Sequence, residues 1–225
     1  MESRICINPS ILNANFNDLE NEIAKVSEVS DFLHLDIMDN IFVPNFTFDL
    51  KKAFEIISLS KLPVDSHLMI SNPDEIAPLY AENGSASVTF HFEAATDVGK
   101  TVSNIRSSGS KVGLAIKPAT QLNEIEKWIE KIDMLLIMTV EPGFGGQSFM
   151  QDQLEKVSQA RTIIERFPKN KPNLQIDGGV SLETIGDAAR AGANCFVAGS
   201  AVYKADNPAE MVSSLRKFAQ ANYRF

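Results

Sequence analysis

The feature that most constrains this chain is an eightfold alternation between short apolar runs and longer amphipathic stretches. The short runs are rich in β-branched residues and the longer ones have helical spacing, which predicts alternating strands and helices. Eight such units without a Pro-, Ser- or charge-rich linker favour a closed parallel barrel over a doubly wound sheet with an extra domain. We therefore expect an α/β fold, a single-domain (β/α)8 TIM barrel over residues 1–225. Strands are expected to begin near Arg4, Phe32, Pro63, Ala86, Lys111, Met134, Asn173 and Asn194.

Local signals place the ends of several helices. Asn72 and Asn207 each precede a proline and a first turn with carboxylates, a pattern that predicts a capping residue at a helix N-terminus. Gly84, Gly109 and Gly192 follow amphipathic stretches, where a glycine enters the left-handed region at low cost and ends a helix.

Composition and charge limit the classes of function. With 225 residues and 44% hydrophobic content, the chain is large enough for one sizeable core. Its 21 basic and 29 acidic residues give a net charge of −8, which opposes binding to nucleic acid and to anionic membrane surfaces. Cys6 and Cys195 lie in separate apolar runs and are expected to be buried without forming a disulfide. No apolar run near the N-terminus suits a signal peptide or a membrane span, so we expect a cytoplasmic enzyme.

The second predicted strand carries polar residues on one face. His34, Asp36 and Met38 alternate with Leu35 and Ile37, so the two sets point in opposite directions. The apolar set suits contact with helices, and the polar set must then point into the barrel. A His and a carboxylate two residues apart near a strand end can close on one divalent metal ion, although such a pair alone is a weak signal.

Two more predicted strands carry the same residue types. The third strand contains Asp65 and His67, and the seventh ends at Asp177. Two histidines and two aspartates from three strand ends would form a site of nitrogen and oxygen ligands, suited to Zn²⁺, Fe²⁺, Mn²⁺ or Co²⁺. Burial of unpaired charges is costly, which favours a functional reading of the whole set over a structural one.

Glycine-rich segments follow the sixth, seventh and eighth predicted strands. They lie at residues 140–147, 178–179 and 197–201. Glycines let backbone amides approach an anion closely, and phosphate sites in such barrels often lie after strands seven and eight. Each segment alone is also typical of a tight turn, but together they predict a phosphate site.

Other polar and sulfur-containing residues near strand ends have more than one interpretation. Met38, Met69 and Met138 are either gap fillers or a polarizable shield that excludes water beside a developing anion. His91 and Glu93 follow the fourth strand and are expected to be a supporting or structural pair rather than further metal ligands.

Seven segments resemble the ribulose-phosphate 3-epimerase family, and they extend from the first predicted strand to the eighth. The similarity therefore covers essentially the whole chain, and its motifs are specific. The segments are 8–12 (NPSIL), 34–39 (HLDIMD), 42–45 (FVPN), 65–69 (DSHLM), 140–147, 177–180 (DGGV) and 198–201 (AGSA).

The resemblance implies a ribulose-phosphate-binding barrel that interconverts D-ribulose 5-phosphate and D-xylulose 5-phosphate. It implies one divalent metal ion held by His34, Asp36, His67 and Asp177, with Asp36 and Asp177 as the catalytic acid/base pair. Inversion beside a ketone passes through an enediolate and needs one such group on each face of the substrate. The implied substrate contacts are Ser10, His67, Gly143, Phe144, Gly145, Gly146, Asp177, Gly178, Gly179, Gly199 and Ser200.

Two positions depart from the family pattern. Asn40 and Asp49 each stand where the family often has glycine, which leaves the path of the loop after the second strand open. This loop could affect subunit contacts, and we expect a homo-oligomer, either a dimer or a hexamer.

Three other functions compete with this interpretation. A decarboxylase of the related phosphate-binding barrels would carry a lysine where this chain has Met38. An epimerase of a hexulose phosphate, such as allulose 6-phosphate, resembles this chain closely. A non-catalytic phosphosugar-binding protein would have no need of both carboxylates.

Overall fold

A computed structural model describes residues 5–225 and contains one sheet of eight parallel strands. The strands pair in the order β1-β8-β7-β6-β5-β4-β3-β2. An isolated parallel bridge between Ser10 and His34 joins β1 to β2, the two ends of that order. The predicted (β/α)8 barrel is thus confirmed. The strands are β1 Cys6–Pro9, β2 Leu33–Met38, β3 Val64–Met69, β4 Ser87–His91, β5 Lys111–Ile116, β6 Met134–Met138, β7 Asn173–Asp177 and β8 Cys195–Ala198.

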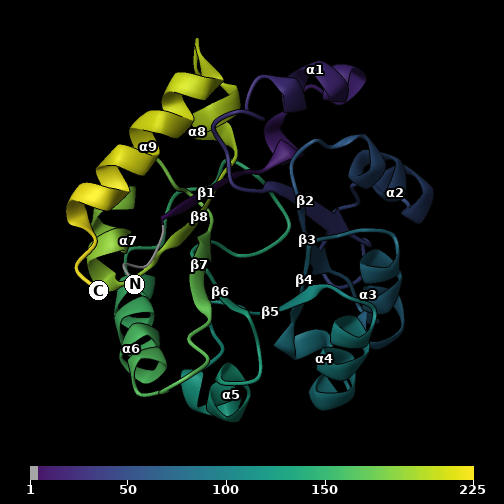
Figure 1. Cartoon of the computed structure of the whole chain (residues 1–225), viewed down its shortest axis with the longest axis vertical. Coiled ribbons are helices and arrows are strands. Elements are labelled where there is room, and N and C mark those ends of the chain that lie inside the picture. Colours follow the sequence, from purple (N-terminus) through teal and green to yellow (C-terminus); the bar gives the residue numbers. More distant parts are fainter. Residues whose placement is uncertain (1–4) are drawn as a thin grey trace.

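Helices surround the strands, as Figure 1 shows. The α-helices are α1 Leu19–Ala24, α2 Leu50–Leu59, α3 Pro73–Glu82, α4 Val98–Ser107, α5 Leu122–Ile129, α6 Gln153–Glu165, α7 Ile185–Ala191, α8 Ser200–Tyr203 and α9 Pro208–Asn222. Short 3-10 turns lie at η1 Ile11–Asn13, η2 Phe16–Asp18 and η3 Phe92–Ala94. Among the described helices, none combines the length and apolar composition that crossing a bilayer requires.

The predicted strand starts agree with the structure within two residues, and Arg4 lies outside the described residues. Asn207 caps α9 as expected, because its side chain accepts a hydrogen bond from the Glu210 amide. Asn72 occupies the N-cap position of α3 and Pro73 begins the helix, so the predicted helix start is confirmed. The expected capping hydrogen bond is not formed, because the Asn72 backbone is not extended.

The two faces of the strands differ in polarity. Outward side chains such as Leu35 and Phe90 belong to the large apolar cluster that the helices cover. Inward positions include His34, Asp65 and Gln175, which are also buried. Because a buried polar group needs a partner, the barrel interior must contain a connected polar network.

Candidate active site

Four predicted metal ligands meet inside the barrel and come from three strands. His34 and Asp36 lie on β2, His67 on β3 and Asp177 at the end of β7. One ligand atom from each residue lies within 4.8 Å of the other three. The barrel therefore brings together nitrogen and oxygen donors from positions far apart in the sequence.

The two histidines direct different ring nitrogens at this cluster. His67 Nδ1 lies 3.0 Å from Asp36 Oδ1 and 3.6 Å from Asp177 Oδ2. His34 Nε2 lies 3.3 Å from Asp36 Oδ1 and 4.0 Å from Asp177 Oδ2. Although this nitrogen is buried, it makes no hydrogen bond with a described residue.

The two carboxyl groups have opposite pKa shifts. Burial alone would raise the pKa of Asp36, but the positive charge of His34 and the hydrogen bond from His67 outweigh it and hold this pKa well below its usual range. Burial, followed by the negative charge of Asp36, raises the pKa of Asp177 to about 6. In this environment Asp36 strongly favours the carboxylate, and Asp177 takes up a proton more readily than an ordinary aspartate.

Each candidate histidine ligand has a second partner behind it. His34 Nδ1 lies 3.0 Å from Asp65 Oδ2, and His67 Nε2 lies 3.0 Å from His91 Nε2. Burial lowers the pKa of His91 to about 4, so this ring is neutral at physiological pH. The prediction of His91 as a supporting residue agrees with this placement. The role of Asp65 was missed, although its alternation with His67 places both on the inner face of β3.

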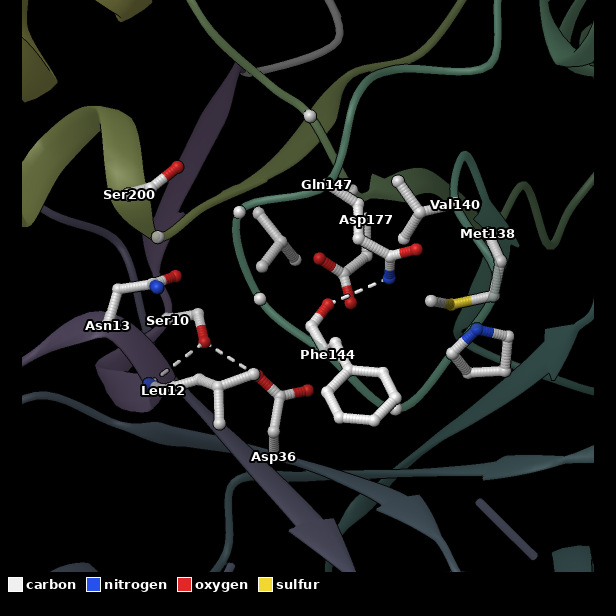
Figure 2. Close-up of a pocket in the computed structure, with 18 of the residues that line it drawn as sticks. Ser10, Leu12, Asn13, Asp36, Met138, Val140, Phe144, Gln147, Asp177 and Ser200 are labelled. Carbon is white, nitrogen blue, oxygen red and sulfur yellow. Dashed lines mark hydrogen bonds between the residues drawn. The ribbon is translucent and has the colours of Figure 1, made fainter. Parts of the chain in front are cut away.

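A cavity opens above the four-residue cluster, and Figure 2 shows Asp36 and Asp177 directed into it. Ser10 Oγ donates a hydrogen bond to Asp36 Oδ2 at 2.6 Å and accepts one from the Leu12 amide at 3.3 Å. The hydroxyl therefore fixes one Asp36 oxygen while the other faces the histidines. His34 and His67 are fully buried beneath the cavity and do not line it.

The predicted glycine-rich segments converge on the same cavity. Its wall includes Phe144, Ser200 and the six glycines Gly143, Gly145, Gly146, Gly178, Gly179 and Gly199. Gly179 has a φ of +66°, and a Cβ there would lie 2.5 Å from the backbone nitrogen of Phe149. Only glycine suits this position. The backbone of three loops thus lines one cavity, which is the arrangement that an anion site requires.

Asn13 was missed by the sequence interpretation, although it also lines the cavity. Its side chain lies between two of the loops in Figure 2. A Cβ on Gly145 would lie 2.9 Å from Asn13 Oδ1, and a Cβ on Gly199 would lie 2.4 Å from the same atom. Asn13 therefore fills the space that both glycines leave open. A single asparagine in a turn carries no sequence signal for such a contact.

The three predicted methionines also line the cavity. Met38 and Met69 are neighbours in the β2–β3 register and belong to one apolar cluster with Val43. Met138 belongs to a separate cluster with Val140. The methionines thus border the cavity from two sides rather than as one group.

The two departures from the family pattern have local explanations. Asn40 has a φ of +57°, a left-handed conformation that asparagine tolerates better than most residues other than glycine. Asp49 caps α2, because its side chain accepts a hydrogen bond from the Lys52 amide at 2.8 Å. Both substitutions are therefore compatible with an ordered loop.

Comparisons with known proteins agree with this geometry. Residues 6–203 match the model of the Ribulose-phosphate 3 epimerase family. A ribulose-phosphate 3-epimerase of Mycobacterium leprae is 46% identical over 96% of this chain and 95% of the relative. The cytoplasmic isoform of the rice enzyme (Oryza sativa subsp. japonica) is 37% identical over 96% of this chain and 95% of the relative.

Solved structures support the architecture. A structure of KGPDC from Streptococcus mutans has a TM-score of 0.74 at 13% identity and covers 98% of this chain and 99% of that chain. Orotidine 5'-phosphate decarboxylase from Pyrococcus horikoshii has a TM-score of 0.64 at 15% identity and covers 95% and 99% of the two chains. At such identities the likeness concerns the fold alone.

Proposed function

Because the chain belongs to the ribulose-phosphate 3-epimerase family, we propose that it interconverts D-ribulose 5-phosphate and D-xylulose 5-phosphate. The observation that carries this proposal is the presence of Asp36 and Asp177 in one cavity, with pKa values shifted in opposite directions. An inversion by two groups needs one group that starts as the base and another that starts as the acid. Two carboxyl groups with different proton affinities meet that need.

The residues at the barrel mouth suit one divalent metal ion. His34 Nε2 is a buried ring nitrogen without a hydrogen-bond partner among the described residues, and it is directed at three other candidate ligands. Nitrogen and oxygen donors of this kind suit Zn²⁺, Fe²⁺, Mn²⁺ or Co²⁺. His34, Asp36, His67 and Asp177 would hold the ion, and the ion would supply positive charge that stabilises an enediolate.

The chain's own side chains would carry the proton. The Asp36 carboxylate removes the proton from the third carbon of the ketose, and the Asp177 carboxyl group returns a proton to the opposite face. Ser10 orients Asp36 through its 2.6 Å hydrogen bond. Reaction in the reverse direction exchanges the roles of the two carboxyl groups.

The remaining cavity residues would bind the substrate and exclude water. The amides of the glycine loops suit the phosphate group, because backbone N–H groups can donate to its oxygens. Met38, Met69 and Met138 would shield the enediolate from solvent, because their thioethers are apolar and polarizable. His67, beneath the cavity, would act on the substrate through the metal ion rather than by direct contact.

A coupled assay for xylulose 5-phosphate, with purified protein and ribulose 5-phosphate, tests the activity. We expect turnover with the pentulose phosphate and much weaker turnover with allulose 6-phosphate. A preference for the hexulose phosphate would contradict the proposed substrate. Tight binding of both sugars without turnover would instead indicate a phosphosugar-binding protein.

The proposal also covers the domain organisation, the location in the cell and the oligomeric state. We infer that residues 1–225 act as one catalytic domain in the cytoplasm, with a phosphosugar as substrate and with neither nucleic acid nor membrane as a partner. We also propose that the chain forms a homo-oligomer, either a dimer or a hexamer. Sedimentation velocity of the purified protein distinguishes these states from a monomer.

A further inference from the structure

A third histidine lies directly behind the proposed metal ligands. His91 ends β4, is fully buried and does not belong to the four-residue cluster. Its ring stacks on the ring of His67, with centroids 5.1 Å apart and an angle of 29° between the planes. The two Nε2 atoms lie 3.0 Å apart, which is hydrogen-bonding distance. A single hydrogen must therefore lie between them, and it is bonded either to His67 Nε2 or to His91 Nε2.

Glu93 lies on the far side of His91. His91 Nδ1 lies 3.3 Å from Glu93 Oε2. An ionised carboxylate only accepts hydrogen bonds, so His91 Nδ1 must carry a hydrogen. If His67 Nδ1 binds a metal ion, that nitrogen carries no hydrogen, so the hydrogen between the rings must belong to His67 Nε2. His91 Nε2 then accepts it, and His91 Nδ1 donates to Glu93.

Glu93 is itself held in place by the next segment of the barrel. Its Oε1 accepts hydrogen bonds from the Lys117 amide at 2.7 Å and from the Thr120 hydroxyl. The carboxylate oxygen that faces His91 is therefore oriented by residues that follow β5. Glu93 therefore orients the His91 ring, and His91 in turn orients the His67 ring.

We propose that His91 is a positioning residue that holds His67 in the Nε2–H tautomer and thereby presents His67 Nδ1 to the metal ion. This proposal rests on the metal site of the proposed function. A metal ligand needs an unprotonated nitrogen, and the partner of its other ring nitrogen fixes both the tautomer and the ring orientation.

The second candidate histidine ligand provides a contrast within the same site. His34 offers Nε2 to the cluster and is held from behind by the carboxylate of Asp65, 3.0 Å from its Nδ1. His67 offers the other nitrogen and is held by a neutral imidazole. Both partners accept a hydrogen bond from the ring nitrogen that faces away from the cluster, so His91 cannot be replaced by a residue that only packs.

Three variants separate hydrogen bonding from packing. In His91→Gln, the amide oxygen can accept from His67 Nε2–H and the amide nitrogen can donate to Glu93. In His91→Leu, neither hydrogen bond remains. Phe90→Leu is the matched control, since Phe90 is a buried neighbour on β4 that faces the helices instead of the barrel interior.

The measurement is the affinity for Co²⁺ alone, obtained by competition with a chelator in the absence of substrate. We expect His91→Leu to bind Co²⁺ about 10–100-fold more weakly than the parent, in the range that loss of such a partner usually costs. His91→Gln should recover most of the affinity, and Phe90→Leu should keep it even if it unfolds at a lower temperature. Parental affinity in His91→Leu, or equal weakness in the Gln and Leu variants, would overturn the proposal.

A spectroscopic measurement on the Zn²⁺-loaded parent does not depend on any variant. The ¹⁵N–¹H correlations of the histidine rings distinguish the two tautomers, and we expect Nε2–H for His67 with Nδ1–H for His91. A hydrogen on His91 Nε2 would overturn the proposal. This result also separates the proposal from the proposed function, because an inactive parent with the expected tautomers would contradict only the epimerase activity.

Discussion

At the scale of single residues, the clearest division of labour is between Asp36 and Asp177. Each is expected to serve one face of the substrate. In Asp177→Asn, epimerisation should fall by about 10²–10⁴-fold, the usual contribution of one acid/base group. Asp36 should still remove and return a proton on its own face, so deuterium from heavy water should enter the third carbon of the substrate without net inversion.

The measurement follows deuterium in each epimer by NMR beside net conversion, with the metal content of the variant determined at the same time. Asp36→Asn should show the mirror preference, with exchange confined to the other epimer. If Asp177→Asn retains metal and epimerises at near the parent rate, another group must reprotonate the intermediate.

A second prediction at this scale concerns two cavity glycines with left-handed backbones. Gly179 has a φ of +66° and Gly146 a φ of +74°, but only Gly179 faces a neighbouring backbone, at Phe149. Gly146→Ala should therefore cost only the conformational penalty of about 1–2 kcal/mol. Gly179→Ala must also displace the backbone, so it should raise the KM for ribulose 5-phosphate much more. Equal effects of the two substitutions on KM would show that steric contact with Phe149 is unimportant.

At the scale of elements, Asn13 links η1 to two loops of the cavity. In Gly199→Ala the new Cβ would lie 2.4 Å from Asn13 Oδ1, so the loop after β8 must shift. We expect a higher KM for the phosphosugar and weaker competition by inorganic phosphate. Asn13→Ser removes the obstructing atom, and the double variant should recover part of the lost affinity.

Steady-state kinetics of the four proteins in this cycle measure the coupling. Residues in contact typically show interaction energies of about 0.5–3 kcal/mol. Additive effects of the two substitutions would mean that Asn13 does not restrict the loop after β8.

The elements also show what the sequence can and cannot predict. Strand starts were predictable because apolar periodicity and β-branched composition are local, and the inward face of β2 followed from the alternation of His34 and Asp36 with apolar residues. The missed contacts are those made between distant segments. Asn13 meets Gly145 and Gly199 only after the barrel closes, and Asn72 takes a backbone conformation that its capping motif does not reveal.

At the scale of the whole molecule, the fold and the site depend on different parts of the barrel. Helices and outward strand faces form the large apolar cluster, whereas the candidate metal ligands project from the inner faces of three strands. Most of the free energy of folding should come from apolar burial, which the metal ion does not affect. Bound metal adds stability only through its preference for the folded state.

Removal of the metal ion should therefore abolish epimerisation while the barrel remains folded. After exhaustive chelation we expect an unchanged far-ultraviolet circular dichroism spectrum and a single cooperative thermal transition at a lower temperature. Excess Zn²⁺, Mn²⁺, Fe²⁺ or Co²⁺ should restore activity to an extent that depends on the ion. The control is the parent taken through the same steps without chelator. Full activity in protein shown to be metal-free would contradict the proposed role of the ion, and loss of the helical spectrum would show that the four ligands also hold the barrel closed.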